Sequence, residues 1–305
     1  MVDRTLPDWI AAQLPAGARD VDVETRGERV HALVWGPDIG RTVVLVHGNP
    51  TWGFLWRKVV AALRARPGGD GLRLVVPDLV GLGRSSRPPA AAHTLAHHGE
   101  WLGDAIDRLA PGPLVLVAQD WGGPIGLRAL ADRASRLRGL VLGNTAVGPP
   151  APGFRPTLFH RLSRAPIVSD LLFRGLGFPL GVLHFTQGDR ASIRGDVARA
   201  YRWPLRRVAD RAAPLALARM VPDRLGHPSV AELAVCEELY RTARVPIELV
   251  WGTKDPILGR VVGHASRLRP DANVTRTPAG HFLQEEVPDA LADAIASVVA
   301  RADWS

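Results

Sequence analysis

Short apolar runs rich in Val and Leu recur along the chain and alternate with longer helix-like stretches, and this alternation constrains the fold more than any other feature. Such runs are typical of parallel strands buried on both faces, with the intervening helices covering the two sides of the sheet. The pattern therefore predicts an α/β fold with a mostly parallel central sheet. The predicted strands are 42–48, 72–79, 113–120, 137–145, 245–255 and 272–281.

An antiparallel hairpin at residues 21–36 is expected at the edge of this sheet, because its apolar and polar residues alternate around a central Gly. The helical patterns lie between the strands and at the end of the chain. The predicted helices are 54–67, 93–109, 123–136 and 287–302.

The alternation stops between residues 147 and 221. This stretch is rich in Pro and Gly, has helical runs such as 165–176, and holds five of the seven Phe residues of the chain. Its length and aromatic content favour a helical cap over a site, and a helical excursion with a small core of its own is the alternative. The predicted domains are a core formed by residues 1–146 and 222–305 and a cap formed by 147–221.

The composition limits the classes of function that this protein can have. The 305 residues, 46% of them hydrophobic, are enough for one large core, and the single cysteine, Cys236, allows neither an internal disulfide nor a cysteine metal cluster. The net charge of +8 bears on solubility and steering, and only residues 201–211 form a local basic cluster, so no nucleic-acid partner is expected. With neither a signal peptide nor an apolar run of ~20 residues, a cytoplasmic protein with no membrane partner is expected. A homo-oligomer is left open.

Chemistry-bearing residues end three of the predicted strands. In open α/β sheets ligands bind beyond the carboxyl ends of the strands. Asp120, Asp255 and His281 occupy such ends, and their chain order matches the nucleophile, acid and base of the α/β-hydrolase triad. The sequence has no G-x-S-x-G motif, which excludes an ordinary serine esterase or lipase. A carboxylate therefore stands where such enzymes carry Ser.

Each of these residues also has a simpler interpretation. Asp120 could be the N-cap of helix 123–136, although the small neighbours Ala118 and Gly122 suit a strained strand-to-helix turn. Asp255 before Pro256 could be a turn former, and His281 an ordinary loop histidine. By the same reasoning, Asn49 could hold its loop by its side chain.

The chain resembles the haloalkane dehalogenases of the α/β-hydrolase superfamily from about residue 20 to the end. The resemblance rests on HGNPTWGFLWRKV (47–59), QDWGGPIG (119–126), the late GHFLQEE (280–286) and the cap segment AYRWPL (200–205). It implies an α/β-hydrolase fold with an inserted helical cap. An Asp-His-Asp triad combined with an Asn-Trp halide pair is similar to the third subgroup of that family.

A carboxylate nucleophile suits substitution at sp³ carbon, because the alkyl ester it forms is stable until water hydrolyses it. His281 would activate that water and Asp255 would orient His281. The backbone N–H groups of Asn49 and Trp121 would form the oxyanion hole, and their side chains would bind the departing halide. This chemistry needs a small hydrophobic halogenated substrate and releases a halide ion, with no metal and no organic cofactor.

Two other functions stay open at this stage. An epoxide hydrolase would need an acidic donor such as the cap residue Tyr201 to reach the substrate oxygen. A non-catalytic binder of hydrophobic ligands would not need Asp120. A halo acid is disfavoured because no Arg follows Asp120, and Asn144, at the end of strand 137–145, cannot serve as the acid and has no assigned role.

Overall fold

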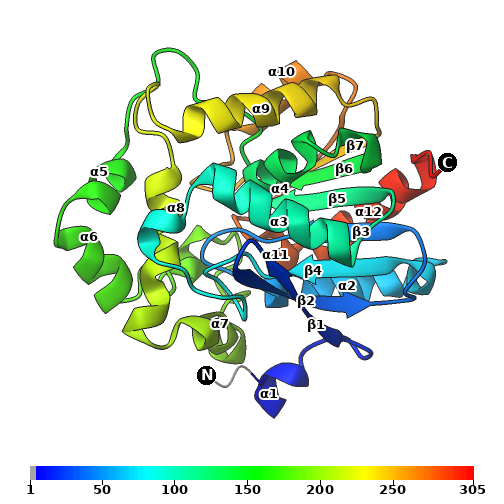
Figure 1. Cartoon of the computed structure of the whole chain (residues 1–305), viewed down its shortest axis with the longest axis horizontal. Coiled ribbons are helices and arrows are strands. Elements are labelled where there is room, and N and C mark those ends of the chain that lie inside the picture. The colour runs from blue at the N-terminus through cyan, green and yellow to red at the C-terminus, as the bar shows by residue number, and fades with distance from the viewer. Residues whose placement is uncertain (1–4) are drawn as a thin grey trace.

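Eight strands form one sheet in the order β1-β2-β4-β3-β5-β6-β7-β8 in the computed structural model, which describes residues 5–305 (Figure 1). β2 pairs antiparallel with β1 and β4, and the other neighbours pair parallel. This arrangement confirms the predicted fold class and the hairpin at the sheet edge. The strands are β1 (Arg19–Thr25), β2 (Glu28–Trp35), β3 (Thr42–Val46), β4 (Arg73–Pro77), β5 (Leu114–Gln119), β6 (Leu137–Gly143), β7 (Ile247–Gly252) and β8 (Asn273–Thr277).

Every residue of β3 and β5 is buried. Apolar side chains of these central strands project to both faces of the sheet, and both faces are covered. Neighbouring positions alternate between two hydrophobic clusters: Val44 and Leu116 belong to one, whereas Val43 and Val115 belong to the other. This two-sided burial explains why the strands read as continuous apolar runs in the sequence.

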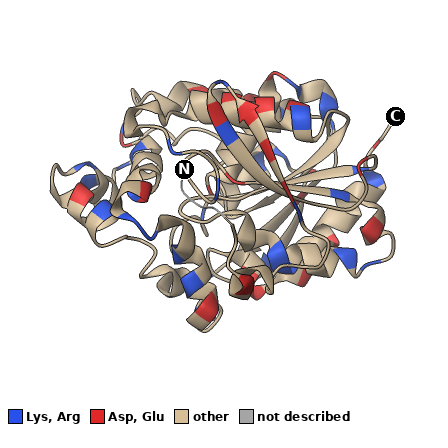
Figure 2. Ribbon diagram, turned by 60° about the horizontal axis from the view of Figure 1, so that its bottom comes forward, with Lys and Arg blue, Asp and Glu red and all other residues tan. Residues whose placement is uncertain are grey.

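Helices cover both faces of the sheet (Figure 2). α3, α4 and α9 pack together on one face, and α2 packs with α12 on the other. These helices and those at the chain ends and beside the strands are α1 (Asp8–Ala11), η1 (Gly53–Trp56), α2 (Arg57–Arg64), η2 (Gly69–Gly71), η3 (Ala90–Ala92), α3 (Leu95–Leu109), α4 (Gly122–Ala131), η4 (Ala134–Arg136), α9 (Ser229–Thr242), α10 (Val262–Leu268), α11 (Leu283–Glu286) and α12 (Pro288–Arg301).

Helices and turns also fill the chain between Leu158 and Met220, and α5 to α8 lie together at one end of the molecule (left in Figure 1). The boundaries of a cap at 147 and 221 stay a prediction. Within residues 5–305, no helix is both long and apolar enough to cross a bilayer. The segments are α5 (Leu158–Arg164), α6 (Val168–Asp170), η5 (Leu171–Gly175), η6 (Leu183–Thr186), α7 (Gly195–Arg202), η7 (Trp203–Leu205), η8 (Val208–Arg211) and α8 (Ala212–Met220).

Candidate active site

Asp120 forms the turn between β5 and α4. Its backbone has a φ of 52°, in the left-handed region that L-residues with side chains rarely adopt. Small neighbours make room for this turn: a Cβ on Gly122 would lie 2.3 Å from the carbonyl oxygen of Val46, and one on Gly48 would lie 2.3 Å from Oδ1 of Asp120. The local sequence therefore holds the Asp120 side chain in a strained, fixed direction.

Backbone N–H groups fix the position of the Asp120 carboxylate. The backbone N–H of Asn49 donates to Oδ1 at 2.8 Å, and the backbone N–H of Trp121 also donates to the carboxylate. The Thr145 hydroxyl donates to the backbone carbonyl of Asp120 at 2.6 Å. The N-cap of α4 is Trp121, with no side-chain cap, so the N-cap interpretation of Asp120 is wrong. Its side chain stays 16% exposed.

His281 lies between the two aspartates. Its Nε2 is 3.6 Å from Oδ2 of Asp120, and its Nδ1 is 2.9 Å from Oδ2 of Asp255. The other oxygen of Asp255 accepts the backbone N–H of Ile257 at 2.7 Å, so this residue forms a turn as well as contacting His281. The geometry is that of a carboxylate, an imidazole and a second carboxylate in line.

Burial and charge act against each other in this row. Burial raises the pKa of Asp120, and the nearby His281 and the backbone N–H donors reduce that rise without cancelling it. Burial alone would lower the pKa of His281, but the charge and hydrogen bond of Asp255, with the charge of Asp120, raise it above its ordinary value. A neutral His281 with its proton on Nδ1 presents the lone pair of Nε2 toward Asp120.

Two further side chains hold His281 and Asp255. The Asn144 amide donates to Oδ2 of Asp255 at 2.8 Å, which gives the residue without an assigned role a clear contact. Gln119, directly before Asp120, places its Nε2 3.1 Å from the backbone carbonyl oxygen and 3.3 Å from Nε2 of His281. No role was expected for Gln119 from the sequence, where its only signal is its position beside Asp120.

The side chains of Asn49 and Trp121 differ in their surroundings. Nδ2 of Asn49 donates to the carbonyl of Pro214 in α8 at 3.0 Å, so this residue also ties its loop to a helix of the predicted cap. An amide nitrogen carries two hydrogens, and this bond uses one of them. The indole N–H of Trp121 has no hydrogen-bond partner within the described chain, and its residue is 8% exposed.

Tyr201 is fully buried, and its hydroxyl is engaged by a residue outside the row of Asp120, His281 and Asp255. Its hydroxyl donates to the carboxylate of Glu285, which Arg57 also contacts through both terminal nitrogens. Burial, with the charge of Glu285, raises the pKa of Tyr201 well above its ordinary value. The other tyrosine, Tyr240, donates to the carbonyl of Ala265 at 3.2 Å. Neither phenol is therefore available as an acid beside Asp120.

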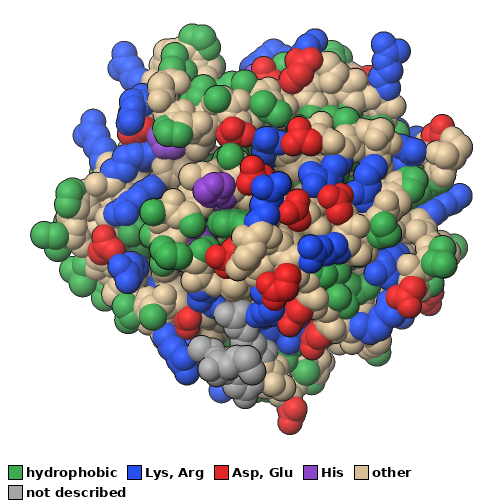
Figure 3. All heavy atoms as spheres, in the orientation of Figure 1, with side chains coloured by type: hydrophobic (Ala, Val, Ile, Leu, Met, Phe, Trp, Pro, Cys, Tyr) green, Lys and Arg blue, Asp and Glu red, His purple; other side chains and the backbone are tan. Residues whose placement is uncertain are grey.

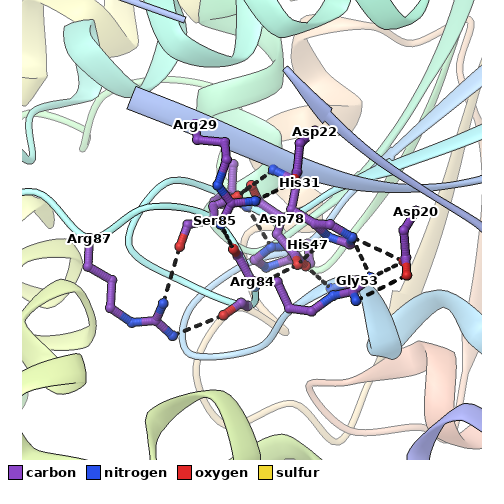
Figure 4. A network of polar contacts seen from close by, with 12 residues as sticks. Asp20, Asp22, Arg29, His31, His47, Gly53, Asp78, Arg84, Ser85 and Arg87 are labelled. Carbon is purple, nitrogen blue, oxygen red and sulfur yellow. Dashed lines mark hydrogen bonds and ion pairs between the residues drawn. The ribbon is translucent and has the colours of Figure 1, made fainter. Parts of the chain in front are cut away.

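A buried polar network anchors the loop that carries Asn49 (Figure 4). Asp78 accepts the backbone N–H of Gly53 at 2.7 Å and contacts Nδ1 of His31 at 3.0 Å. His47 accepts the backbone N–H of Leu79 through Nε2 at 2.9 Å. Burial acts to raise the pKa of Asp78, but the bonds and charge of His31 prevail and hold it at about 2. The loops after β3 and β4 are thus fixed to each other.

The described residues include no group of three or more His, Cys, Asp and Glu side chains placed to hold a metal ion. Cys236 is buried, and burial raises the pKa of its thiol to about 12, so the thiolate form is disfavoured.

Comparison with known proteins identifies the family. A model of the α/β hydrolase fold matches residues 41–288. The chain is 32% identical to haloalkane dehalogenase 2 of Mycobacterium tuberculosis over 286 residues, which are 88% of this chain and 90% of that protein. The chain belongs to the haloalkane dehalogenase family. A second member, the haloalkane dehalogenase of Mycobacterium marinum, is 32% identical over 93% of this chain and 94% of its own.

Solved structures of family members share the fold. A haloalkane dehalogenase from Bradyrhizobium elkani superposes with a TM-score of 0.82 at 22% identity, over 93% of this chain and 98% of that one. One from Agrobacterium tumefaciens gives 0.82 at 23% identity, over 95% and 99%. The α/β-hydrolase fold expected from the sequence is confirmed.

Proposed function

We propose that this family member hydrolyses the carbon–halogen bond of small apolar haloalkanes, with Asp120 as nucleophile, His281 as base and Asp255 as its orienting acid. The observation that supports this most is the row in which Nε2 of His281 lies 3.6 Å from Asp120 and Nδ1 lies 2.9 Å from Asp255. This row supports a carboxylate nucleophile beside a base that a second carboxylate orients.

In the first step, Oδ2 of Asp120 attacks the sp³ carbon that carries the halogen. Oδ1 is held by the N–H of Asn49, which leaves Oδ2, on the His281 side, for the attack. The new carbon–oxygen bond forms as the carbon–halogen bond breaks, and the halide leaves with the electron pair. The product is a neutral alkyl ester of Asp120.

In the second step, water attacks Cγ of that ester while Nε2 of His281 takes its proton. Negative charge develops on Oδ1, to which the backbone N–H of Asn49 already donates, and the backbone N–H of Trp121 contacts the same carboxylate. Collapse of the tetrahedral intermediate breaks the Cγ–Oδ2 bond, and the protonated His281 gives its proton to the departing alkoxide, which leaves as the alcohol. The carboxylic acid that remains on Asp120 loses its proton and becomes a carboxylate again. One water is consumed, and one alcohol, one halide and one proton are released.

The side chains of Trp121 and Asn49 suit the departing halide. A diffuse anion is met by neutral donors, and these residues offer an indole N–H and the second hydrogen of an amide nitrogen. Together with Asp120, His281 and Asp255, this pair supports assignment to the third subgroup of the family. Substrates with chloride, bromide or iodide fit such donors.

Epoxide hydrolysis is the weaker candidate on this site. Opening an epoxide requires a proton donor for the developing alkoxide, and Tyr201 is buried with its hydroxyl on Glu285. Moving it to the site would leave a buried carboxylate with one hydrogen bond fewer. Carbon–halogen substrates require no such acid.

The covalent ester is the feature to test first. In a His281→Gln variant the first step proceeds and the second lacks its base, so 1-bromohexane should release one bromide per protein. The peptide containing Asp120 should then gain the mass of one hexyl group. His264→Gln provides the matched control, because His264 pairs with Glu237 outside this row, and it should turn over as the wild type does.

An Asp120→Ala variant should give neither bromide release nor a mass gain. If the His281→Gln variant released bromide without any alkylated peptide, water would be the direct nucleophile and the proposal would fail. If the wild type released no bromide but opened styrene oxide, the site would belong to an epoxide hydrolase.

A further inference from the structure

One segment accounts for the whole net positive charge of the chain. Residues 147–221 contain 12 Arg and 4 Asp, with no Lys and no Glu, so this segment carries a net charge of +8. The whole chain also has a net charge of +8, from 38 basic and 30 acidic residues, so the remaining 26 basic and 26 acidic residues balance. The basic residues are scattered along the sequence, but the net charge belongs to the predicted cap.

Large apolar side chains are exposed on the same segment. Nine of the 13 exposed large hydrophobic residues of the described chain lie between residues 147 and 221, although this segment is about a quarter of the protein. Ile167 is 82% exposed and Leu176 is 74% exposed. The others are Leu158, Phe159, Leu162, Val168, Leu171, Phe185 and Val208.

Most of these residues lie on α5, α6 and η5, which we call the outer cap face (residues 155–176). α5 and α6 are adjacent at the end of the molecule farthest from the C-terminus (Figure 1), and in Figure 3 the same end shows apolar and basic side chains intermixed. Phe173 packs inward against Leu215 and Ala218, so the segment already has its own anchor. The exposed residues are left facing outward.

Two arginines of the outer cap face are available for a ligand. Arg155 and Arg161 are exposed, and within the described chain their side chains make no hydrogen bond or ion pair. The one acid of the outer cap face, Asp170, is already paired with Arg174 at 3.2 Å and with Arg219 at 3.6 Å. Arg155 and Arg161 therefore leave uncompensated positive charge on this face.

A basic groove continues from this face. It has a volume of about 790 Å³ and is lined by Leu176 together with Arg199, Arg202 and Arg206. Arg211 connects two segments beside this groove, because its guanidinium donates to the carbonyl of Gly175 at 2.9 Å and to that of Leu205 at 2.7 Å. Leu176, at the end of the outer cap face, therefore lies beside the arginines of the groove.

We propose that the outer cap face binds the surface of an anionic lipid bilayer. Apolar side chains flanked by arginines match the two layers of such a surface: the apolar groups enter the acyl boundary and the guanidinium groups pair with lipid phosphates. A second copy of the chain is a poorer occupant, because docking through this face would bring two segments of charge +8 together. The phosphates of a nucleic acid would pair with the arginines, but the exposed aliphatic residues would stay in contact with water.

Adsorption of this kind requires no spanning helix. The expectation of no membrane partner rested on the lack of a long apolar run, which bears on insertion across a bilayer. Surface binding depends instead on which side chains are exposed, and the sequence pattern alone does not reveal that. Binding at this face also requires no catalysis, so it stands apart from the reaction proposed above.

Sedimentation of the full chain with lipid vesicles tests the proposal. Vesicles of phosphatidylglycerol and phosphatidylcholine should bind at least tenfold more protein than vesicles of phosphatidylcholine alone. An Ile167→Gln/Leu171→Gln variant and an Arg155→Gln/Arg161→Gln variant should each reduce binding by roughly tenfold. All four side chains lie on the surface, so the thermal unfolding midpoint should not move. The matched controls, outside the predicted cap, are Ile39→Gln, at a residue 93% exposed, and Arg108→Gln.

Three results would overturn the proposal. Equal binding to neutral and anionic vesicles, or none to either, would remove the lipid assignment. Loss of binding in the arginine variant alone, with a short DNA duplex competing fully, would indicate a general polyanion site. Equal loss in the Ile39 and Arg108 controls would show that no particular face is involved.

Discussion

Asn144 holds the carboxylate of Asp255 with a hydrogen bond of 2.8 Å, and this single amide joins three parts of the site. Its Nδ2 also donates to the carbonyl of Gly280 at 3.0 Å, directly before His281. Its Oδ1 accepts the backbone N–H of Gly252, at the end of β7, at 2.8 Å. Asn144 follows β6, so it fixes the acid and the base relative to the neighbouring strand.

An Asn144→Ala substitution should slow the second step and spare the first. Asp255 would keep the N–H of Ile257 but lose its side-chain donor, and His281 would be less well oriented. Steady-state halide release should fall roughly a hundredfold, while the first burst of halide keeps its rate in rapid-quench measurements. Asn273→Ala, whose amide contacts Glu248 instead, is the control. An equal fall in burst rate would show that Asn144 supports the fold instead of positioning the acid.

The rate of ester hydrolysis should have an acid limb, because protonation of His281 removes the base. In the free enzyme the charges of Asp255 and Asp120 raise the pKa of His281 above 6.5, so there His281 becomes protonated before the pH falls to that value. The limb should lie at lower pH in the alkylated enzyme than in the free enzyme, because the ester of Asp120 carries no charge. Titration of His281 by NMR measures its pKa in the free enzyme, and single-turnover rates against pH measure the acid limb in the alkylated enzyme. A limb at the same pH in both would contradict the role given to the Asp120 charge.

The strand ends that carry Asp120, Asp255 and His281 could be located from the sequence. Buried parallel strands give unmistakable apolar runs, and their carboxyl ends meet along one edge of the sheet. The ends of the helices were predicted less accurately. The predicted helix 54–67 begins as the short 3₁₀ turn η1, and the predicted helix 123–136 ends at Ala131. α10 was not predicted, because seven residues carry too little periodicity to be recognised.

Contacts between distant side chains could not be read from the sequence. The direction of the Tyr201 hydroxyl depends on Glu285, which is 84 residues away, and nothing in the pattern of either segment indicates the pair. The roles of Gln119 and Asn144 likewise depend on how side chains reach between strand ends. Exposure of the outer cap face was equally hidden, since a helix of mixed composition does not show which side it buries.

Replacing Trp121 with Phe should weaken halide binding and slow carbon–halogen cleavage. The substitution keeps the backbone N–H that donates to Asp120 and removes the indole donor. We expect the burst rate to fall by roughly tenfold to a hundredfold, as a lost donor to a charged group implies, and inhibition by added bromide to weaken. Trp304→Phe is the control, because its indole donates to Val299 near the C-terminus. Unchanged bromide inhibition in Trp121→Phe would exclude the indole as a halide ligand.

An Asp78→Asn substitution should destabilise the protein by about 3 kcal/mol at pH 7, because it leaves His31 without its buried carboxylate.

The pKa of Asp78 is lowered from 3.8 to about 2 in the folded chain. Its ionisation therefore stabilises the fold by about 2 kcal/mol above pH 3.8, and that contribution is lost as the pH falls through about 2. The pKa of His31 is raised, so its share is present at low pH and lost as the pH rises through that value. Urea unfolding from pH 2 to 8 should show the deficit of Asp78→Asn shrinking toward low pH. The exposed Asp70→Asn should match the wild type, and a deficit independent of pH would mean that packing, not charge, is what Asp78 contributes.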